Sequence, residues 1–170
     1  MTTPSEPTAP FPVSGRLLGV DYGTKRVGLS LATPDRTMAS PLELYERRNE
    51  QLDTRYYRSI LEDYRPVGIV VGLPIHVGGE ESQKSHEARQ YGAWLHSITG
   101  LPVTYWDERF TSAVAEDFLL AAELTRKQRK KRIDMVAAQI ILQSYLDAHH
   151  PKPKPMKETA VESDDLQDDL

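Results

Sequence analysis

Four acidic side chains occupy positions that a structural role alone does not explain. They are Asp21, Asp107, Glu108 and Asp134. Asp21 ends a short apolar run, the Asp107-Glu108 pair follows another, and Asp134 lies beside an apolar helical stripe. An isolated buried carboxylate is costly, whereas converging carboxylates supply the oxygen ligands that Mg²⁺ and Mn²⁺ prefer. The set predicts a divalent-metal site, and two such ions about 4 Å apart can promote phosphodiester hydrolysis.

Each of these carboxylates also has a structural explanation. Asp21 precedes Tyr-Gly, so it can simply start a turn. Either member of the Asp107-Glu108 pair can bind Arg109 or cap the following helix. Asp134 can form an exposed ion pair with a lysine one turn earlier, worth about 0.3 to 0.5 kcal/mol. The metal-site prediction therefore rests on the four residues together.

Basic residues beside the carboxylates are candidates for phosphate contacts, because lysine and arginine supply most of the sequence-independent affinity for nucleic acids. Lys25 and Arg26 closely follow Asp21, and we expect one of them to neutralise phosphate charge. The alternative is an exposed hairpin turn with solvated charges. Arg109 either contacts the substrate or holds Asp107 in place.

A dense basic run over residues 126–132 lies just before Asp134. Such a run is often a solvated helix face, but next to a metal site it would guide a polyanion into that site. His76 lies in a loop, and we expect it to make a loop contact rather than act as a general base, since metals make a base unnecessary.

The elements that must position these residues alternate between strands and helices. Strands are expected over residues 17–20, 27–32, 37–44, 67–71 and 103–106, and helices over 50–64, 81–98, 112–124 and a last segment with apolar residues from 133 to 145. The first three strands should be antiparallel and the continuous apolar run at 67–71 a buried parallel strand. This order predicts an α/β fold with a mixed sheet flanked by helices, in which ligands collect beyond the strand ends.

Length and composition indicate one domain. The 170 residues include no cysteine, which excludes disulfides and thiolate metal sites and suits a reducing cytoplasm. Without a leader or an apolar span, the protein is expected to be soluble and unsecreted. We expect a disordered arm over 1–14, a domain over 15–150 and a disordered acidic tail over 151–170. The net charge of -4 comes from the arm and the tail, which leaves the domain neutral and a nucleic-acid partner permitted.

Four ordered motifs resemble the YqgF family, also called the RuvX or pre-16S rRNA nuclease family. They are Leu18-Gly-Val-Asp-Tyr-Gly-Thr-Lys-Arg-Val-Gly-Leu-Ser30, Val70-Val-Gly-Leu-Pro74, Asp107-Glu-Arg-Phe-Thr111 and Lys131-Arg-Ile-Asp-Met-Val-Ala-Ala138. The resemblance covers about residues 15 to 147. It implies a ribonuclease H-like fold related to the RuvC Holliday junction resolvases, a cytoplasmic location, hydrolysis with Mg²⁺ or Mn²⁺, and processing of the 5′ end of 16S rRNA. Ribosomal particles are the partner that this role suggests.

The resemblance also assigns the metal ligands to Asp21, Glu108 and Asp134. Asp107 remains an alternative to Glu108, because adjacent side chains on a strand point to opposite faces. Two departures concern the substrate contacts rather than these ligands. The loop Ile75-His-Val-Gly-Gly79 lacks the usual Asn and Asp, and Thr33 stands where the family has an Asp near the end of the second strand.

Three other functions remain open from the sequence. An ATP-binding protein of the actin, hexokinase and Hsp70 type shares the first-loop pattern, but it needs two such domains. A non-catalytic RNA- or protein-binding module would not need the acidic set. A junction resolvase would use the same chemistry on DNA and would need a dimer, whereas the sequence permits a monomer or a homodimer.

Overall fold

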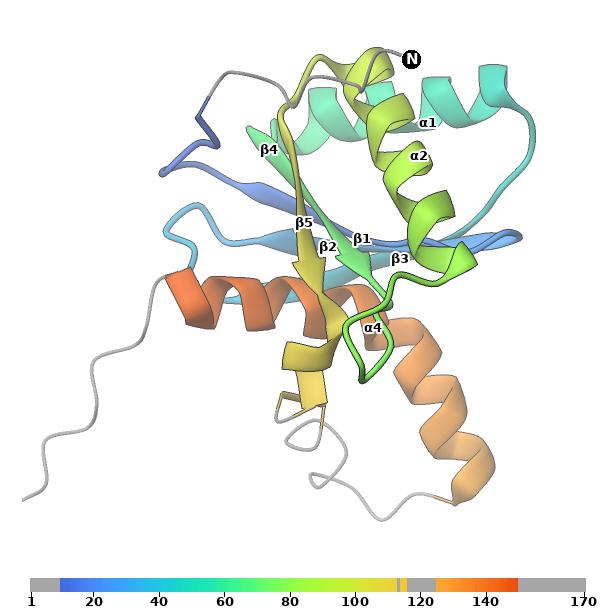
Figure 1. Cartoon of the computed structure of the whole chain (residues 1–170). Coiled ribbons are helices and arrows are strands. Elements are labelled where there is room, and N and C mark those ends of the chain that lie inside the picture. The colour runs from blue at the N-terminus through green and yellow to red at the C-terminus, as the bar shows by residue number, and fades with distance from the viewer. Residues whose placement is uncertain (1–9, 113, 116–124, 150–170) are drawn as a thin grey trace, which may run out of the picture.

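Five strands form one sheet with helices on both of its faces (Figure 1). The structure is a computed structural model, and it describes residues 10–112, 114–115 and 125–149. The elements are β1 (Leu17–Asp21), β2 (Arg26–Ala32), β3 (Ala39–Glu46), α1 (Glu50–Tyr64), β4 (Gly68–Leu73), α2 (Gln83–Thr99), β5 (Val103–Asp107), the 3₁₀ helix η1 (Glu108–Thr111) and α4 (Arg126–His149). The expected α/β fold with a mixed sheet is confirmed, with strand ends that differ from expectation by one to two residues.

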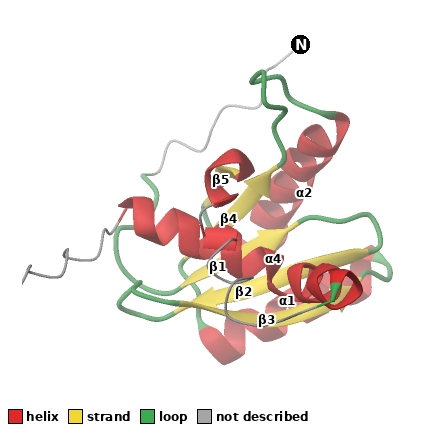
Figure 2. Ribbon diagram, turned by 90° about the horizontal axis from the view of Figure 1, so that it is seen from below, coloured by secondary structure: helices red, strands yellow, loops and turns green. Residues whose placement is uncertain are grey.

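The strand order in the sheet is β3-β2-β1-β4-β5 (Figure 2). β2 is antiparallel to both β1 and β3, as expected, while β1, β4 and β5 are parallel to one another. All six residues of β4 are buried, because helices cover both faces of this central parallel strand. The carboxyl ends of β1, β4 and β5 therefore meet at one edge of the sheet.

Two hydrophobic cores hold the layers together. One lies between the sheet and the pair α1 and α2, and the other lies between the sheet and α4. Alternate residues of β4 supply both cores: Ile69 and Val71 face the first, and Val70 faces the second. Each such buried side chain contributes about 1.5 to 3 kcal/mol, so the sheet edge that carries the acidic residues stands on a rigid base.

Helix α4 packs very closely on β1 and β2. A Cβ atom at Gly19 would lie 2.8 Å from Cβ of Leu142, so only glycine allows this approach. The Ser30 hydroxyl donates a 2.7 Å hydrogen bond to the carbonyl of Ala138 on the helix. These contacts fix α4 across the sheet near the end of β1, with Asp134 one turn before Ala138.

The helices α1 and α2 begin and end at residues that the sequence indicates. Asn49 caps α1 by accepting a hydrogen bond from the Leu52 amide. Ser82 caps α2, and Gly100 ends it with a left-handed φ of 71°. The predicted bounds of α1 match those observed, and α2 begins two residues later than predicted.

The chain from residue 108 to the start of α4 differs in part from the prediction. Thr111 ends η1, a turn that was not predicted, and its hydroxyl donates to the carbonyl of Glu108. Residues 112, 114 and 115 are helical, as expected for a helix over 112–124. Most of the segment 112–124 lies outside the described residues. The basic run was expected to precede the last helix, but it is the first part of α4. Thr125 and Gln128 cap this helix reciprocally through side chain and backbone.

Most of the expected arm and all of the residues 151–170 lie outside the described part of the chain. Phe11 is described, and its ring packs edge-on against Tyr145 at 6.1 Å between centroids. No helix among the described residues is long and apolar enough to span a membrane.

Candidate active site

Asp21 and Glu108 lie at neighbouring points on one edge of the sheet. Asp21 is the last residue of β1, and Glu108 directly follows β5, with β4 between the two strands. The Glu108 carboxylate extends over β4, because a Cβ atom added at Gly72 would come within 2.8 Å of its Oε1 atom. The missing side chain at Gly72 thus leaves the space in which Glu108 reaches towards Asp21.

The two carboxylates affect each other's protonation. Burial raises the pKa of Glu108, and the charge of Asp21 raises it further, to about 7. Burial also raises the pKa of Asp21. The positive charge of Lys84 lowers both pKa values, but it does not cancel the effect of burial. The site favours positive charge between its two acidic groups.

Asp134 lies near this pair and belongs to helix α4. It lies in the exposed part of α4, and its charge raises the pKa of Asp21. Gly28 lets α4 come close to Asp21, because a Cβ atom there would lie 3.4 Å from Cβ of Asp21 and 3.5 Å from Cβ of Ala138, one turn after Asp134. In the described part of the chain no three acidic or histidine side chains are already close enough to hold a metal. The structure therefore shows a close carboxylate pair with a third carboxylate nearby.

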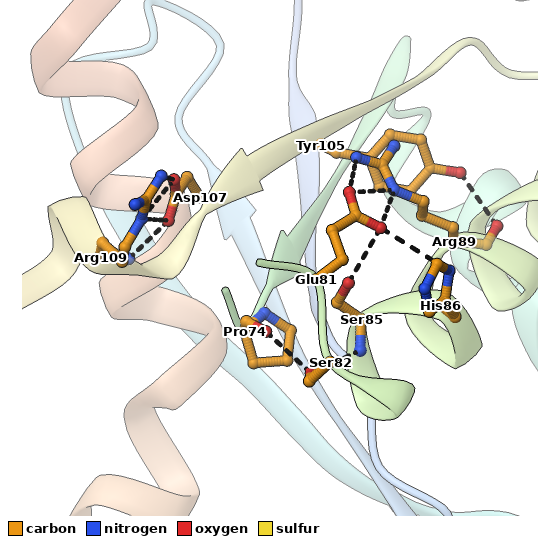
Figure 3. Close-up of polar contacts among 9 residues, drawn as sticks. All are labelled: Pro74, Glu81, Ser82, Ser85, His86, Arg89, Tyr105, Asp107 and Arg109. Atoms are coloured by element: carbon orange, nitrogen blue, oxygen red, sulfur yellow. Dashed lines mark hydrogen bonds and ion pairs between the residues drawn. The ribbon is translucent and has the colours of Figure 1, made fainter. Parts of the chain in front are cut away.

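Asp107 is occupied by Arg109 (Figure 3). Its carboxylate accepts from the Arg109 backbone at 2.9 Å and from Nε at 2.8 Å. These hydrogen bonds hold the pKa of Asp107 below its usual value. Of the adjacent acidic pair, the structure brings Glu108 to Asp21, while Asp107 orders the turn that begins η1.

The basic side chains predicted to contact phosphate do not gather around the carboxylates. Lys25 and Arg26 are exposed in and after the β1–β2 turn, and neither is among the charges that shift the pKa of Asp21. Arg109 is exposed and paired with Asp107. Among the described residues, Lys84 in the first turn of α2 is the cation whose charge lowers the pKa of both carboxylates. No signal in the sequence pointed to Lys84, because its position depends on how α2 is placed over the sheet edge.

The loop between β4 and α2 forms a small hairpin beside the site. Ile75 pairs with Glu81 as an isolated antiparallel bridge, and exposed His76 lies in the turn between them. Glu81 forms an ion pair with Arg89, which also lies over the Tyr105 ring (Figure 3). Ser82, the α2 cap, donates to the Pro74 carbonyl at 3.0 Å. These bonds fix the start of α2 and hence the place of Lys84.

The basic run extends from the site as the first turns of α4. In Figure 1 these turns run away from the sheet, whereas the second half of α4 lies across it. The side chains from residue 126 to 130 are exposed, and Asp134 follows one turn later. A line of positive charge thus leads outward from the acidic edge of the sheet.

Comparisons with known proteins found a matching family and several relatives. A family model described as "RuvX: Holliday junction resolvase" matches residues 15–148. A protein of Rhodopirellula baltica named "Putative pre-16S rRNA nuclease" is 46% identical over 138 residues, which are 81% of this chain and 80% of that protein. Proteins of the same name from Koribacter versatilis and Lactococcus lactis are 39% and 42% identical and are covered to 90% and 95%, with 81% and 79% of this chain aligned.

A solved structure shows the same fold at low sequence identity. Thermus thermophilus RuvC, determined in complex with a Holliday junction substrate, aligns with a TM-score of 0.51 and 14% identity, over 79% of this chain and 94% of that one. This likeness confirms the ribonuclease H-like fold expected from the motifs. The chain, by its family match and its close relatives, belongs to the RuvX family.

Proposed function

We propose that this protein is a divalent-metal-dependent nuclease that hydrolyses phosphodiester bonds during 5′-end maturation of pre-16S rRNA. A hydrolase acting on ester bonds is the enzyme class of the family and of the named relatives. The observation that carries the proposal is the coupled pair Asp21 and Glu108 at the carboxyl ends of β1 and β5. Among the described residues, Lys84 lowers the pKa of both groups but does not offset the effect of their burial.

Asp21, Glu108 and Asp134 are the proposed metal ligands. Their carboxylate oxygens are the donors that Mg²⁺ and Mn²⁺ select. Burial, together with the neighbouring negative charges, raises the pKa of Asp21 and of Glu108, and a bound cation would offset both causes. When bound, such a cation supplies an activated water and stabilises charge on the phosphate oxygens. Asp107 serves the site indirectly by ordering the turn that presents Glu108.

The cationic side chains have separate proposed roles. Lys84 neutralises phosphate charge next to the carboxylates, while Lys25 and Arg26 contact the backbone of the same strand further along. Arg109 holds Asp107 and lies near the rim of the hairpin loop, where a Cβ at Gly79 would be 3.7 Å from its Nη1 atom. The basic part of α4 draws the polyanion towards the site.

A Holliday junction is the second candidate substrate. It is favoured by the description of the family and by the RuvC likeness, whereas the names of the relatives favour pre-16S rRNA. Resolvases cut two strands symmetrically and need a dimer. RNA maturation needs only one active site, so either a monomer or a homodimer would serve it. With ribosomal RNA as substrate, the proposed place of action is the cytoplasm, on or near ribosomal particles.

The test is cleavage of a labelled 16S rRNA precursor and of a four-way DNA junction. Each substrate is incubated with Mg²⁺, Mn²⁺ or EDTA, and with wild-type protein, Asp21→Asn or Asp63→Asn. Asp63→Asn is the matched control, because Asp63 is exposed on α1. We expect RNA cleavage that needs metal, is lost in Asp21→Asn and is kept in Asp63→Asn. Cleavage of the junction alone would move the substrate to DNA, and no cleavage in any metal would contradict the proposal.

A further inference from the structure

A cavity of about 340 Å³ opens behind the end of β1, between β1, the start of α1 and the face of α2. Its walls combine aromatic rings, a guanidinium group and carboxylates. The residues that carry the inference are Tyr22, Arg47, Glu50, Glu87, Tyr91 and Trp94. This volume lies at the lower end of the range of about 300 to 1,000 Å³ for small-ligand pockets.

The aromatic and cationic walls form one continuous surface. The ring centroids of Tyr22 and Tyr91 lie 5.2 Å apart, and those of Tyr91 and Trp94 lie 5.3 Å apart. The guanidinium carbon of Arg47 lies 5.5 Å from the Tyr22 centroid and 5.1 Å from the Tyr91 centroid. Arg47 is held there by hydrogen bonds to the carbonyls of Gly23 and Thr24. Aromatic rings and arginine planes are the surfaces on which unpaired nucleobases stack.

Carboxylates line the same cavity. Glu87 accepts from the Tyr22 hydroxyl at 3.2 Å through Oε2, and Glu50 accepts from the Trp94 indole at 3.4 Å through Oε1. Each carboxylate has a second oxygen with which to accept from a ligand. Negative charge repels phosphate, but it accepts hydrogen bonds from the amino groups of a base. The walls therefore suit a base and not the sugar-phosphate backbone.

The cavity adjoins the acidic site at two places, the end of β1 and helix α2. Tyr22 directly follows Asp21 and points to the opposite face of the sheet, where it packs on the core under α1 and α2. Glu87 lies one helical turn after Lys84 on α2. The cavity therefore adjoins the acidic site along the chain at Tyr22 and along α2 at Glu87.

We propose that the cavity binds one unpaired nucleobase with an exocyclic amino group, from the nucleotide next to the cleaved phosphate, with Glu87 accepting from that amino group. This inference rests on the proposed function, because it takes a single-stranded RNA segment as the ligand. Among the pyrimidines it selects cytosine over uracil, since uracil presents a carbonyl oxygen where cytosine presents its amino group.

The test measures binding without cleavage. Asp21→Asn protein in EDTA is titrated with fluorescein-labelled oligo-C or oligo-U ribonucleotides, and anisotropy gives the affinity while tryptophan emission reports stacking. We expect oligo-C to bind at least fivefold more tightly than oligo-U and to quench emission, with the quenching lost in Trp94→Phe. Equal affinities, or quenching that persists in Trp94→Phe, would overturn the inference.

Variants at Glu87 test the role of this carboxylate, and a variant outside the cavity is the matched control. Glu87→Ala and the isosteric Glu87→Gln should both bring the ratio between oligo-C and oligo-U close to one. Glu62→Gln removes one negative charge from an exposed position on α1 outside the cavity, so it should keep the preference. A preference that survives in both Glu87 variants would contradict the role of this carboxylate. Because cleavage is measured separately, RNA cutting without a base preference would refute this inference alone, and a preference without cutting would refute the nuclease alone.

Discussion

Gly72 leaves room for the carboxylate of Glu108 in the middle of the sheet. A Cβ atom at this position would lie 2.5 Å from Cδ1 of Ile141 and 2.8 Å from Oε1 of Glu108. We expect Gly72→Ala to displace Glu108 and to lower kcat for RNA cleavage by about 10- to 100-fold, since a misplacement of about 1 Å can cost that much. Overpacking should cost about 1 to 3 kcal/mol of stability.

The matched control for Gly72 is Gly78→Ala in the neighbouring loop. No atom lies within 4 Å of a Cβ built at Gly78. Cleavage rates and thermal melting should both stay at the wild-type level in this control. Full activity in folded Gly72→Ala protein would show that Glu108 does not need its present position.

Loss of the proton of Glu108 should make the metal-free protein less stable as the pH rises. The pKa of about 7 in the folded protein lies above the ordinary value of 4.5, so the folded state binds this proton more tightly than the unfolded state. The resulting stabilisation is complete below about pH 4.5 and is lost as the pH rises through 7. We expect Glu108→Gln to remove about 1 to 3 kcal/mol of this loss between pH 5 and pH 8.

Denaturant unfolding in EDTA at pH 5 and pH 8 measures this effect. Glu62→Gln, an exposed change on α1, should leave the difference between the two pH values unchanged. If Glu108→Gln and wild-type protein lose the same stability over this range, Glu108 is not the group that titrates.

Single residues also show where sequence reasoning ends. Asp21 and Asp134 could be identified as candidates because of their unusual places beside apolar runs and the motifs around them. Only the structure shows that Arg109 binds Asp107 and that the charge of Asp21 acts on Glu108. Lys84 was missed entirely, since only the placement of α2 brings it to the carboxylates.

At the level of elements, apolar periodicity and caps predicted what packs on the sheet. Helix α1 matched its expected bounds because Asn49 and a buried stripe define it. The start of α4 was not predicted, because its first turns are exposed and basic and carry no apolar stripe. Helix capping by Thr125 and Gln128 was the available signal.

The exposed start of α4 should control substrate binding and not the chemical step. We expect Arg129→Gln with Lys130→Gln to weaken RNA binding and raise KM while kcat stays unchanged. Each phosphate contact on a single strand contributes about 0.7 to the slope of log affinity against log salt, so losing two should reduce that slope by about 1.4.

The same change of two charges on α1, Arg55→Gln with Arg58→Gln, is the control, because these side chains are exposed on a different helix. Affinity titrations between low and high salt measure both slopes, and circular dichroism checks the helix content. A basic-run variant with an unchanged slope would mean that RNA does not contact this part of α4.

At the scale of the whole molecule, the strand order explains why distant residues form one site. Parallel β1, β4 and β5 bring residues 21, 72 and 108 to one edge, and α4 adds residue 134 from the opposite end of the sequence. The alternation of strands and helices predicted the fold class, because buried parallel strands need helices on both faces. It could not predict the cavity beside Tyr22, which arises where three elements meet.

Charge distribution leads to a prediction about the whole chain. Residues 151–170 carry three lysines and six acidic residues, so removing this net charge of -3 changes the chain from -4 to -1. Because like charge slows the approach of a polyanion, we expect the chain ending at residue 150 to associate with RNA several-fold faster at low salt. The difference should vanish at high salt, where the Debye length falls to about 3 Å at 1 M, and dissociation rates should not change.

Charge and length can be separated with a full-length variant in which the six acidic residues of this segment are replaced by Asn or Gln. Stopped-flow association with labelled RNA should give the same fast rate for this variant as for the shortened chain, because both remove the acidic charge. If only the shortened chain is faster, the segment obstructs RNA by its bulk, and the electrostatic explanation is wrong.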